Sequence, residues 1–400
     1  MNTDHIQQAN NPTYRLTVLI IMVLIAGFSQ GMLLPLLAIM LEQLGVSSSL
    51  NGLNATALYI GVLIASPFIE KPIRKYGYKP VITIGLILII GSLLLFPLWQ
   101  AFWFWFVLRM IVGIGDNMIH YSTQVWITTT SPENKRGRNI SIYGLAFGLG
   151  FGAGPAMTRL LSINEYLPFV IAALTSLASW LFVLALKNEW PESEIETATN
   201  TGSWHRYKTV VKLAWFALLP GFCYGFLEAS IHGNYPVYAL RSGLTIELVS
   251  ILLPAFVIGG LITQFPLGLL SDRIGRKRLL SIVTLLGGTT FISMIWLEQN
   301  TSLLLIAFVL AGAFVGSLYS LGVMYLADLL PKNLLPTGNV MTAISFGLGS
   351  ITGPLIGGIM IDFIETGSIY FSIGSILIIV FSLSLFFKEK EQEQSVPKTA

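Results

Sequence analysis

The chain has 400 residues, of which 54% are hydrophobic and only 11% are charged, whereas about a quarter of the residues are charged in a typical soluble domain. This composition excludes an ordinary soluble protein. The single cysteine, Cys223, excludes an intramolecular disulfide and a thiolate metal site. The net charge of +3 is small, so the positions of the charges are more informative than their sum.

Long apolar segments follow one another along the whole chain. A bilayer core about 30 Å thick requires about 20 helical residues to cross it. The first fourteen residues are polar, and no small-residue cleavage site follows the first apolar segment, so we interpret that segment as a membrane span and not as a signal peptide. The sequence predicts twelve spans, at residues 15–41, 50–70, 80–99, 102–126, 140–162, 166–187, 209–238, 245–270, 279–297, 302–326, 338–362 and 368–387.

The basic residues predict the orientation of these spans. Nearly all of the 23 Lys and Arg fall before the first span, after the last one, or in every second connecting segment. Because cytoplasmic loops are enriched in Lys and Arg, both termini are predicted to be cytoplasmic. The exceptions are Arg159 and Arg241, which fall on the opposite side, and Arg109, which lies within a span.

A polar stretch after the sixth span divides the chain into two halves. We expect an all-α membrane protein with an N-terminal six-helix bundle at residues 1–187, a cytoplasmic linker at 188–208, a C-terminal six-helix bundle at 209–387 and a disordered cytoplasmic tail at 388–400. We also expect a multi-pass protein of the plasma membrane that functions as a monomer. The basic loops are interpreted as membrane anchoring, and no nucleic-acid partner is expected.

The fourth predicted span contains ionisable residues, which are costly in a membrane and usually face an interior cavity or a partner. Arg109, Asp116 and His120 fall within about 40° of one another at 100° per residue, so they form one stripe. A guanidinium, a carboxylate and an imidazole on one face are suited to holding and passing a proton. The alternative is a structural ion pair between Arg109 and Asp116.

The seventh predicted span contains a second polar face. Tyr224, Glu228 and His232 are spaced at i, i+4 and i+8. A carboxyl group in surroundings of low dielectric is protonated more readily than one in water, as a proton-coupling site or a cation anchor requires. The alternative is that Glu228 already contacts water at the membrane surface. Other polar residues within spans are candidates either for lining a cavity or for bonding a neighbouring helix: Gln30, Asn54, Gln124 and Gln264.

The two halves repeat one another. The sequence AFGLGFGAGP at residues 146–155 returns as SFGLGSITGP 199 residues later, and RKYGYK at 74–79 returns as DRIGRK 198 residues later. Two matches at nearly the same offset indicate a duplicated six-span unit, although glycine is also common in membrane helices by chance. Parallel repeats of this kind place a substrate site near the midplane, between the halves.

The turn between spans eight and nine carries a family resemblance. It reads GLLSDRIGRK at residues 268–277 and closely resembles the cytoplasmic turn of the major facilitator superfamily, and the resemblance covers essentially the whole chain. It implies a gating role, in which Asp272 pairs with guanidinium groups across the interface between the halves and Gly275 allows a tight turn. The alternative is simple positive-inside anchoring. The expected gating residues in this turn are Gly268, Asp272, Arg273, Gly275, Arg276 and Lys277.

Two further motifs resemble those of proton-coupled members. Arg109 followed by Gly113 and Gly115 is similar to the fourth-span motif, in which the arginine is implicated in proton transfer. The fifth-span motif of the drug–proton antiporters is partial here, with Gly154 and Pro155, and complete in span eleven, with Gly353 and Pro354. Small residues permit close helix approach, and proline bends a helix, so both segments are expected to seal the two halves together.

These observations predict a proton-coupled exporter of lipophilic or cationic organic compounds. We expect Asp116 and Glu228 to exchange protons, Arg109 to modulate Asp116, and His120 to relay the proton. Tyr224, Gln30, His232, Gln124, Gln264 and Asn54 are the predicted substrate contacts. No phosphate-binding loop or metal-ligand spacing is present in the sequence, so we expect no cofactor, no metal and no enzyme activity, with the proton gradient as the energy source.

Three alternatives remain open at this point. The protein could be a proton symporter that imports a small polar metabolite, which would require polar cavity residues in both halves. It could be a dedicated exporter or flippase of a single metabolite or amphiphile, which a narrow substrate profile would reveal. Outside transport, it could be a transporter-like membrane sensor, although such proteins usually carry an added soluble signalling segment.

Overall fold

The computed structural model describes residues 11–191, 203–364 and 366–387. Within these residues, twelve helical segments are long and apolar enough to cross a membrane, and their ends lie within seven residues of those of the twelve predicted spans. The predicted all-α fold is therefore confirmed. The predicted tail at 388–400 lies outside the described residues.

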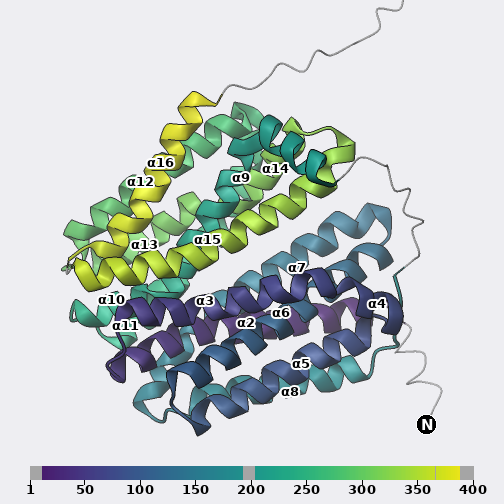
Figure 1. Ribbon diagram of the computed structural model, residues 1–400, viewed down its shortest axis with the longest axis horizontal. Helices are drawn as coiled ribbons and strands as arrows, with labels where there is room; N and C mark the ends of the chain where they lie inside the picture. Colours follow the sequence, from purple (N-terminus) through teal and green to yellow (C-terminus); the bar gives the residue numbers. More distant parts are fainter. Residues whose placement is uncertain (1–10, 192–202, 365, 388–400) are drawn as a thin grey trace, which may run out of the picture.

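Six of these spans form the first bundle (Figure 1). The basic turn after the second span forms a short helix, α4 (Glu70–Tyr76), and the fifth span ends in the 3₁₀ segment η3 (Gly154–Ser162). The long helices of this bundle are α2 (Pro12–Gln43), α3 (Ser48–Ala65), α5 (Tyr78–Leu95), α6 (Phe102–Thr130), α7 (Glu133–Ala153) and α8 (Leu167–Leu184).

The second bundle repeats this arrangement. Its seventh span is interrupted after Gly233, and its tenth span consists of two helices in sequence. The helices of this bundle are α9 (Ser203–Gly233), α10 (Tyr235–Arg241), α11 (Ile246–Ile274), α12 (Arg276–Leu297), α13 (Thr301–Val315), α14 (Leu318–Leu329), α15 (Leu335–Phe363) and α16 (Ser368–Phe386).

Local chemistry sets several helix ends. Asn11 caps α2 by accepting a hydrogen bond from the amide of Thr13 at 2.9 Å, and Pro12 follows at the first helical position. Gly77 and Gly275 occupy equivalent basic turns with φ of 88° and 92°, which side-chain-bearing residues rarely adopt. The tight turn predicted at Gly275 is therefore present.

The segment after the first bundle differs from the predicted linker at 188–208. Asn188 and Glu189 pack on the first bundle: the Asn188 side chain bonds the amide of Lys79 and the carbonyl of Tyr76, and the Glu189 carboxylate bonds Arg15 and the indole N–H of Trp126. At the other end, α9 already begins at Ser203. The linker is therefore shorter than predicted, because Asn188 and Glu189 pack on the first bundle and the residues from Ser203 onward belong to α9.

The two bundles meet at one end of the molecule and diverge toward the other (Figure 1). Across the interface, α3 packs on α15, α7 and η3 pack on α11, and α2 packs on α10. We call the end where the bundles meet the closed end, and it contains the loops that the charge pattern predicts to be extracellular. The opposite end, which contains α4 and the basic turn at Gly275, is called the splayed end.

Candidate functional site

Arg109 is fully buried in α6 and is held by neighbouring helices. Its guanidinium donates to the side-chain oxygen of Asn54 at 2.8 Å and to the carbonyls of Leu33 and Leu34, both at 3.1 Å. The two carbonyls lie beside Pro35, which lacks an N–H and disturbs helical hydrogen bonding in α2. Arg109 therefore ties α6 to α2 and α3, and Asn54, a predicted substrate contact, orients it.

Asp116 lies further along α6 and is 3% exposed. In the part of the chain that the structure describes, it forms no ion pair, and its Oδ2 atom has no hydrogen-bond partner. The structure therefore does not contain the ion pair between Arg109 and Asp116 that was the alternative interpretation of this stripe. Gly113 and Gly115 allow the close packing around this region, because a Cβ atom would lie 2.0 Å from the Leu58 carbonyl oxygen and 2.8 Å from that of Gly85, respectively.

His120 completes the predicted stripe on α6. Its Nδ1 atom lies 2.8 Å from the Tyr143 hydroxyl on α7, and its ring contacts the edge of Phe147. His120 thus faces α7, whereas Arg109 points toward α2 and α3, so the stripe is divided between two sets of neighbours.

The polar face of α9 lies against the other bundle. His232 is fully buried, neither of its ring nitrogens has a partner among the described residues, and its ring contacts the edge of Phe151 on α7 at 4.6 Å between centroids. Glu228, one turn earlier, is half-buried and forms no ion pair or hydrogen bond with any described residue. The structure therefore provides one unpaired carboxyl group from each bundle.

Tyr224 belongs to an aromatic group in the second bundle. Its ring lies 6.4 Å from that of Tyr319 on α14 and 6.2 Å from that of Phe346 on α15, and the latter two rings are 5.6 Å apart. All three rings are half-buried. Together with Glu228, one turn away on α9, they combine aromatic faces with a carboxyl group, an arrangement that suits an organic cation.

Three other predicted substrate contacts, Gln30, Gln124 and Gln264, differ in their exposure, and their side chains have no hydrogen-bond partner among the described residues. Gln30 is half-buried, whereas Gln124 and Gln264 are exposed. The structure records no hydrogen bond from these three side chains to any residue within 11–191, 203–364 or 366–387. Their predicted role stays a prediction.

The two Gly-Pro segments pack within their own bundles and also reach across the interface between the halves. A Cβ atom on Gly154 would lie 2.4 Å from the amide nitrogen of Met32, and one on Gly353 would lie 2.4 Å from the carbonyl oxygen of Phe226. Pro155 opens η3, and Pro354 lies within α15. Both segments also reach across: a Cβ atom on Gly152 of α7 would lie 2.8 Å from a methyl carbon of Val257 on α11, and one on Gly52 of α3 would lie 2.1 Å from the carbonyl oxygen of Pro354.

The basic turn at residues 268–277 forms its contacts within the second bundle. Arg276 bonds Asp272 at 3.2 Å, Asp328 at 2.7 Å and the carbonyl of Met324 at 2.6 Å. Lys277 donates to the carbonyl of Phe387, and Arg273 is exposed. The expected pairing of Asp272 across the interface is therefore not formed in this conformation, in which the bundles diverge at the splayed end.

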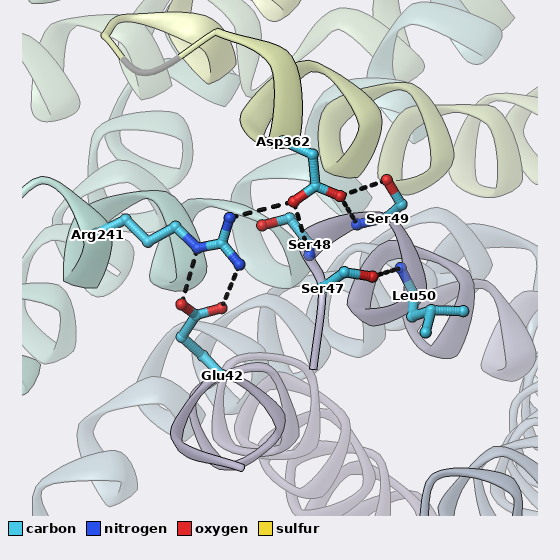
Figure 2. Close-up of polar contacts among 7 residues, drawn as sticks. All are labelled: Glu42, Ser47, Ser48, Ser49, Leu50, Arg241 and Asp362. Atoms are coloured by element: carbon cyan, nitrogen blue, oxygen red, sulfur yellow. Dashed lines mark hydrogen bonds and ion pairs between the residues drawn. The ribbon is translucent and has the colours of Figure 1, made fainter. Parts of the chain in front are cut away.

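The polar contacts between the bundles lie at the closed end instead, as Figure 2 shows. Arg241 of α10 binds both carboxylate oxygens of Glu42 on α2, at 2.8 and 3.1 Å, and also the carboxylate of Asp362 on α15, at 3.1 Å. Asp362 in turn accepts hydrogen bonds from the backbone amides of Ser48 and Ser49 at the start of α3. We call Glu42, Ser48, Ser49, Arg241 and Asp362 the closed-end cluster.

Sequence reasoning missed this cluster, although one signal was available. Arg159 and Arg241 are the two basic residues that break the positive-inside pattern, and both bind across the interface: Arg241 binds Glu42, and Arg159 donates to the Ser250 hydroxyl at 2.6 Å. The hydrogen bond to Glu42 raises the pKa of Arg241 above its usual value. Arg241 therefore keeps its charge at every pH at which the protein would be studied.

Two six-helix bundles that repeat one another and meet at one end are the architecture of two-bundle membrane transport proteins. A family model of the Major Facilitator Superfamily matches residues 19–253 and 221–400. The chain belongs to this superfamily of membrane transporters.

Known proteins similar to this chain agree with that assignment. It is 47% identical over 356 residues to the uncharacterized MFS-type transporter YfkF of Bacillus subtilis, covering 89% of this chain and 91% of that protein. It is 25% identical to Multidrug resistance protein 1 of Bacillus subtilis, over 89% of this chain and 92% of that protein. The crystal structure of the nucleoside transporter NupG has the same fold, with a TM-score of 0.77 at 14% identity, over 93% of this chain and 99% of that one.

Proposed function

We propose that the protein is a proton-coupled secondary transporter that exports lipophilic or cationic organic compounds by alternating access. The observation that carries this proposal is that two carboxyl groups, Asp116 in the first bundle and Glu228 in the second, have no ionic partner among the described residues. Burial in apolar surroundings penalises the charged form of a carboxyl group. Each group therefore favours a bound proton or a bound cation, and competition between the two ligands produces exchange.

The surroundings of Glu228 support an aromatic or lipophilic cargo. Tyr224, Tyr319 and Phe346 offer ring faces within one turn of the carboxyl group or on adjacent helices. A cation over an aromatic face gains about 0.5–2 kcal/mol, more when water is excluded. The similarity to a protein named Multidrug resistance protein 1 is in keeping with this proposal.

The conformation fits the inward-facing state of a plasma-membrane exporter. If the positive-inside pattern holds, both termini and the splayed end face the cytoplasm, and the closed-end cluster seals the outside. Cargo would then enter from the cytoplasm and displace protons from Asp116 and Glu228. Opening of the closed end would release the cargo and admit protons from outside, with no cofactor beyond the proton gradient. The two bundles of one monomer suffice for this cycle.

Transport by purified protein in liposomes tests the proposal directly. Proteoliposomes with an internal pH dye and an imposed proton gradient would be exposed to lipophilic cations, and then to sugars, amino acids and nucleosides. We expect cation-triggered proton movement opposite to the cargo, and its loss in both Asp116→Asn and Glu228→Gln. Asp328→Asn, which removes a carboxylate at the splayed end, is the matched control and should retain exchange.

Three results would overturn all or part of the proposal. Proton movement in the same direction as a polar metabolite would identify a symporter. Normal proton-driven transport in both Asp116→Asn and Glu228→Gln would show that these two carboxyl groups are not the exchange sites. A response restricted to one compound would identify a dedicated exporter and refute a broad specificity.

A further inference from the structure

His232 lies at the end of α9, in the part of the interface nearest the closed end. The next residue, Gly233, meets α3 of the other bundle, where a Cβ atom on the glycine would lie 3.1 Å from that of Ala55. Asn234 then donates to the carbonyl oxygen of Pro354 on α15 at 3.1 Å, within the second bundle. The position of His232 is therefore fixed by the second bundle, whereas its surroundings include the first.

Phe151 of the first bundle supplies the ring that packs against His232. The two rings are nearly perpendicular, at 78°, with 4.6 Å between their centroids. The backbone of Phe151 is held on α2, because a Cβ atom on Gly31 would lie 2.1 Å from the Phe151 carbonyl oxygen. The contact between His232 and Phe151 thus joins two bodies, and it breaks when the bundles separate at the closed end.

The surroundings of His232 suit a neutral imidazole. The residue is 0% exposed, and neither ring nitrogen has a hydrogen-bond partner among the residues that the structure describes. A protonated imidazole has two N–H donors and a positive charge, and burying a charge without a compensating partner is costly. The face of one phenylalanine ring offsets only a small part of that cost. The closed conformation therefore accepts the neutral ring and excludes the charged one.

No described carboxylate forms an ion pair with His232. Glu228, one turn earlier on α9, is on the same helix face. The nearest titratable groups on α3 and α7 are phenols, which are neutral near pH 7: Tyr59, one turn after Ala55, and Tyr143, two turns before Phe151.

The other charged groups and histidines on α9, and on the helices and η3 that pack against α9 or α7, lie farther along their elements from this contact. His120 of α6 is connected to His232 through a row of rings, at 4.9 Å to Phe147 and then 5.7 Å from Phe147 to Phe151. The remaining groups are Arg15, Glu42, Arg109, Asp116, Glu133, Lys135, Arg136, Arg138, Arg159, His205, Arg206, Lys208, Lys212, Arg241, Glu247, Asp272, Arg273, Asp328 and Asp362.

Opening of the closed end would separate the two rings and admit water to His232. An imidazole in water has a pKa of about 6.5, so the open conformation binds a proton that the closed conformation excludes. The closed conformation therefore keeps its full relative stability above about pH 6.5 and loses it as the pH falls below that value. We propose that His232 is a pH-sensitive latch, whose neutral ring packs on Phe151 in the closed conformation and whose protonation stabilises the conformation that is open at that end.

This inference rests on the proposed function in one respect, which is that the bundles separate alternately at their two ends. It does not require Asp116 or Glu228 to exchange protons. If the positive-inside pattern holds, the latch faces the outside. An acidic exterior would then favour the outward-open conformation, in which the exporter is expected to take up protons.

The test measures the closed-end opening of the purified protein as a function of pH. Spin labels on cysteines introduced at Ser162 and Ser302, which are exposed on closed-end segments of different bundles, would report the distance in a Cys223→Ser background. The ratio of long to short distances should rise roughly tenfold between about pH 8 and about pH 5.5, as expected for one group with a pKa of about 6.5 in the open conformation alone. Water-exposed carboxylates titrate near pH 4, below this range.

Two substitutions of His232 should remove this response. His232→Phe keeps an aromatic ring against Phe151 and removes two unpartnered nitrogens, so it is expected to fold. His232→Gln keeps a polar side chain that has no charge to gain. In both variants the ratio should change by less than about twofold over the same pH range. His205→Gln is the matched control, because His205 is an exposed histidine at the splayed end of the same helix, and it should retain the full response.

The outcomes separate the latch from the proposed function. A ratio that does not change with pH in the otherwise native chain, or a response that survives both His232 variants, would show that His232 is not the latch. Loss of the response in Glu228→Gln with its retention in His232→Gln would assign it to the carboxyl group and refute the proposal equally. In each of these cases, cation-driven proton exchange in liposomes would leave the proposed function standing. Label distances that stay fixed with pH and with added lipophilic cation would refute alternating access and the latch together.

Discussion

Removing the Asp362 carboxylate tests whether the closed-end cluster holds the two bundles together. Asp362 accepts hydrogen bonds from the amides of Ser48 and Ser49, at 3.0 and 2.8 Å, in the manner of a helix N-cap supplied by the opposite bundle. Loss of an N-cap acceptor costs about 1 kcal/mol. The ion pair to Arg241 has side chains 36% and 23% exposed, so it adds only about 0.5 kcal/mol.

These contacts exist only while the closed end is closed, so Asp362→Ala should destabilise that conformation by about 1.5 kcal/mol. The ratio of closed to open molecules should fall roughly tenfold, since 1.4 kcal/mol corresponds to a factor of ten. Asp362→Asn should have a smaller effect, because an amide oxygen can still accept a hydrogen bond from one of the serine amides.

Distances between spin labels on the two bundles measure this change. Ser162 at the end of η3 and Ser302 at the start of α13 are exposed on closed-end segments of different bundles. Each would be replaced by cysteine in a Cys223→Ser background and then spin-labelled. Asp362→Ala should add or enlarge a population with longer distances. Asp328→Ala, which breaks an ion pair within the second bundle at the splayed end, should leave the distances unchanged. An unaltered distance distribution in Asp362→Ala would refute the view that this cluster stabilises the closed end.

Two further predictions concern packing within the site. Arg109→Lys should lower the melting temperature of the purified protein by several degrees. A single ammonium group cannot bond the Asn54 oxygen and the α2 carbonyls in the geometry of a guanidinium. An unchanged melting temperature would contradict the role of Arg109 in holding α6 to α2 and α3. Gly52→Ala should weaken the contact between α3 and α15, because the added Cβ atom would lie 2.1 Å from the Pro354 carbonyl oxygen, and the label distances described above should lengthen. Gly91→Ala, where no atom lies within 4 Å of the added carbon, is the control and should leave both properties unchanged.

Much of the candidate site was accessible from the sequence. Asp116 and Glu228 were identified because ionisable residues are rare within spans, and the structure places both without an ionic partner in its described residues. The hydrogen-bond partners of Arg109 could not be predicted from the sequence. Asn54 was predicted to contact substrate, and it instead bonds the guanidinium of Arg109, which comes from a different helix. Helical spacing predicts which side chains share a face, but not which neighbouring helix that face meets.

The positions of the twelve spans and their division into two halves follow from the amino-acid sequence alone. Each membrane helix must satisfy its own backbone hydrogen bonds and bury about 20 apolar residues in lipid, so length and hydropathy along the chain are sufficient. How the two halves meet becomes visible in the three-dimensional arrangement of the helices. The contact of Arg241 with Glu42 joins residues 199 positions apart, and that of Arg159 with Ser250 joins residues 91 positions apart. Such contacts depend on the relative placement of helices, which no local pattern encodes.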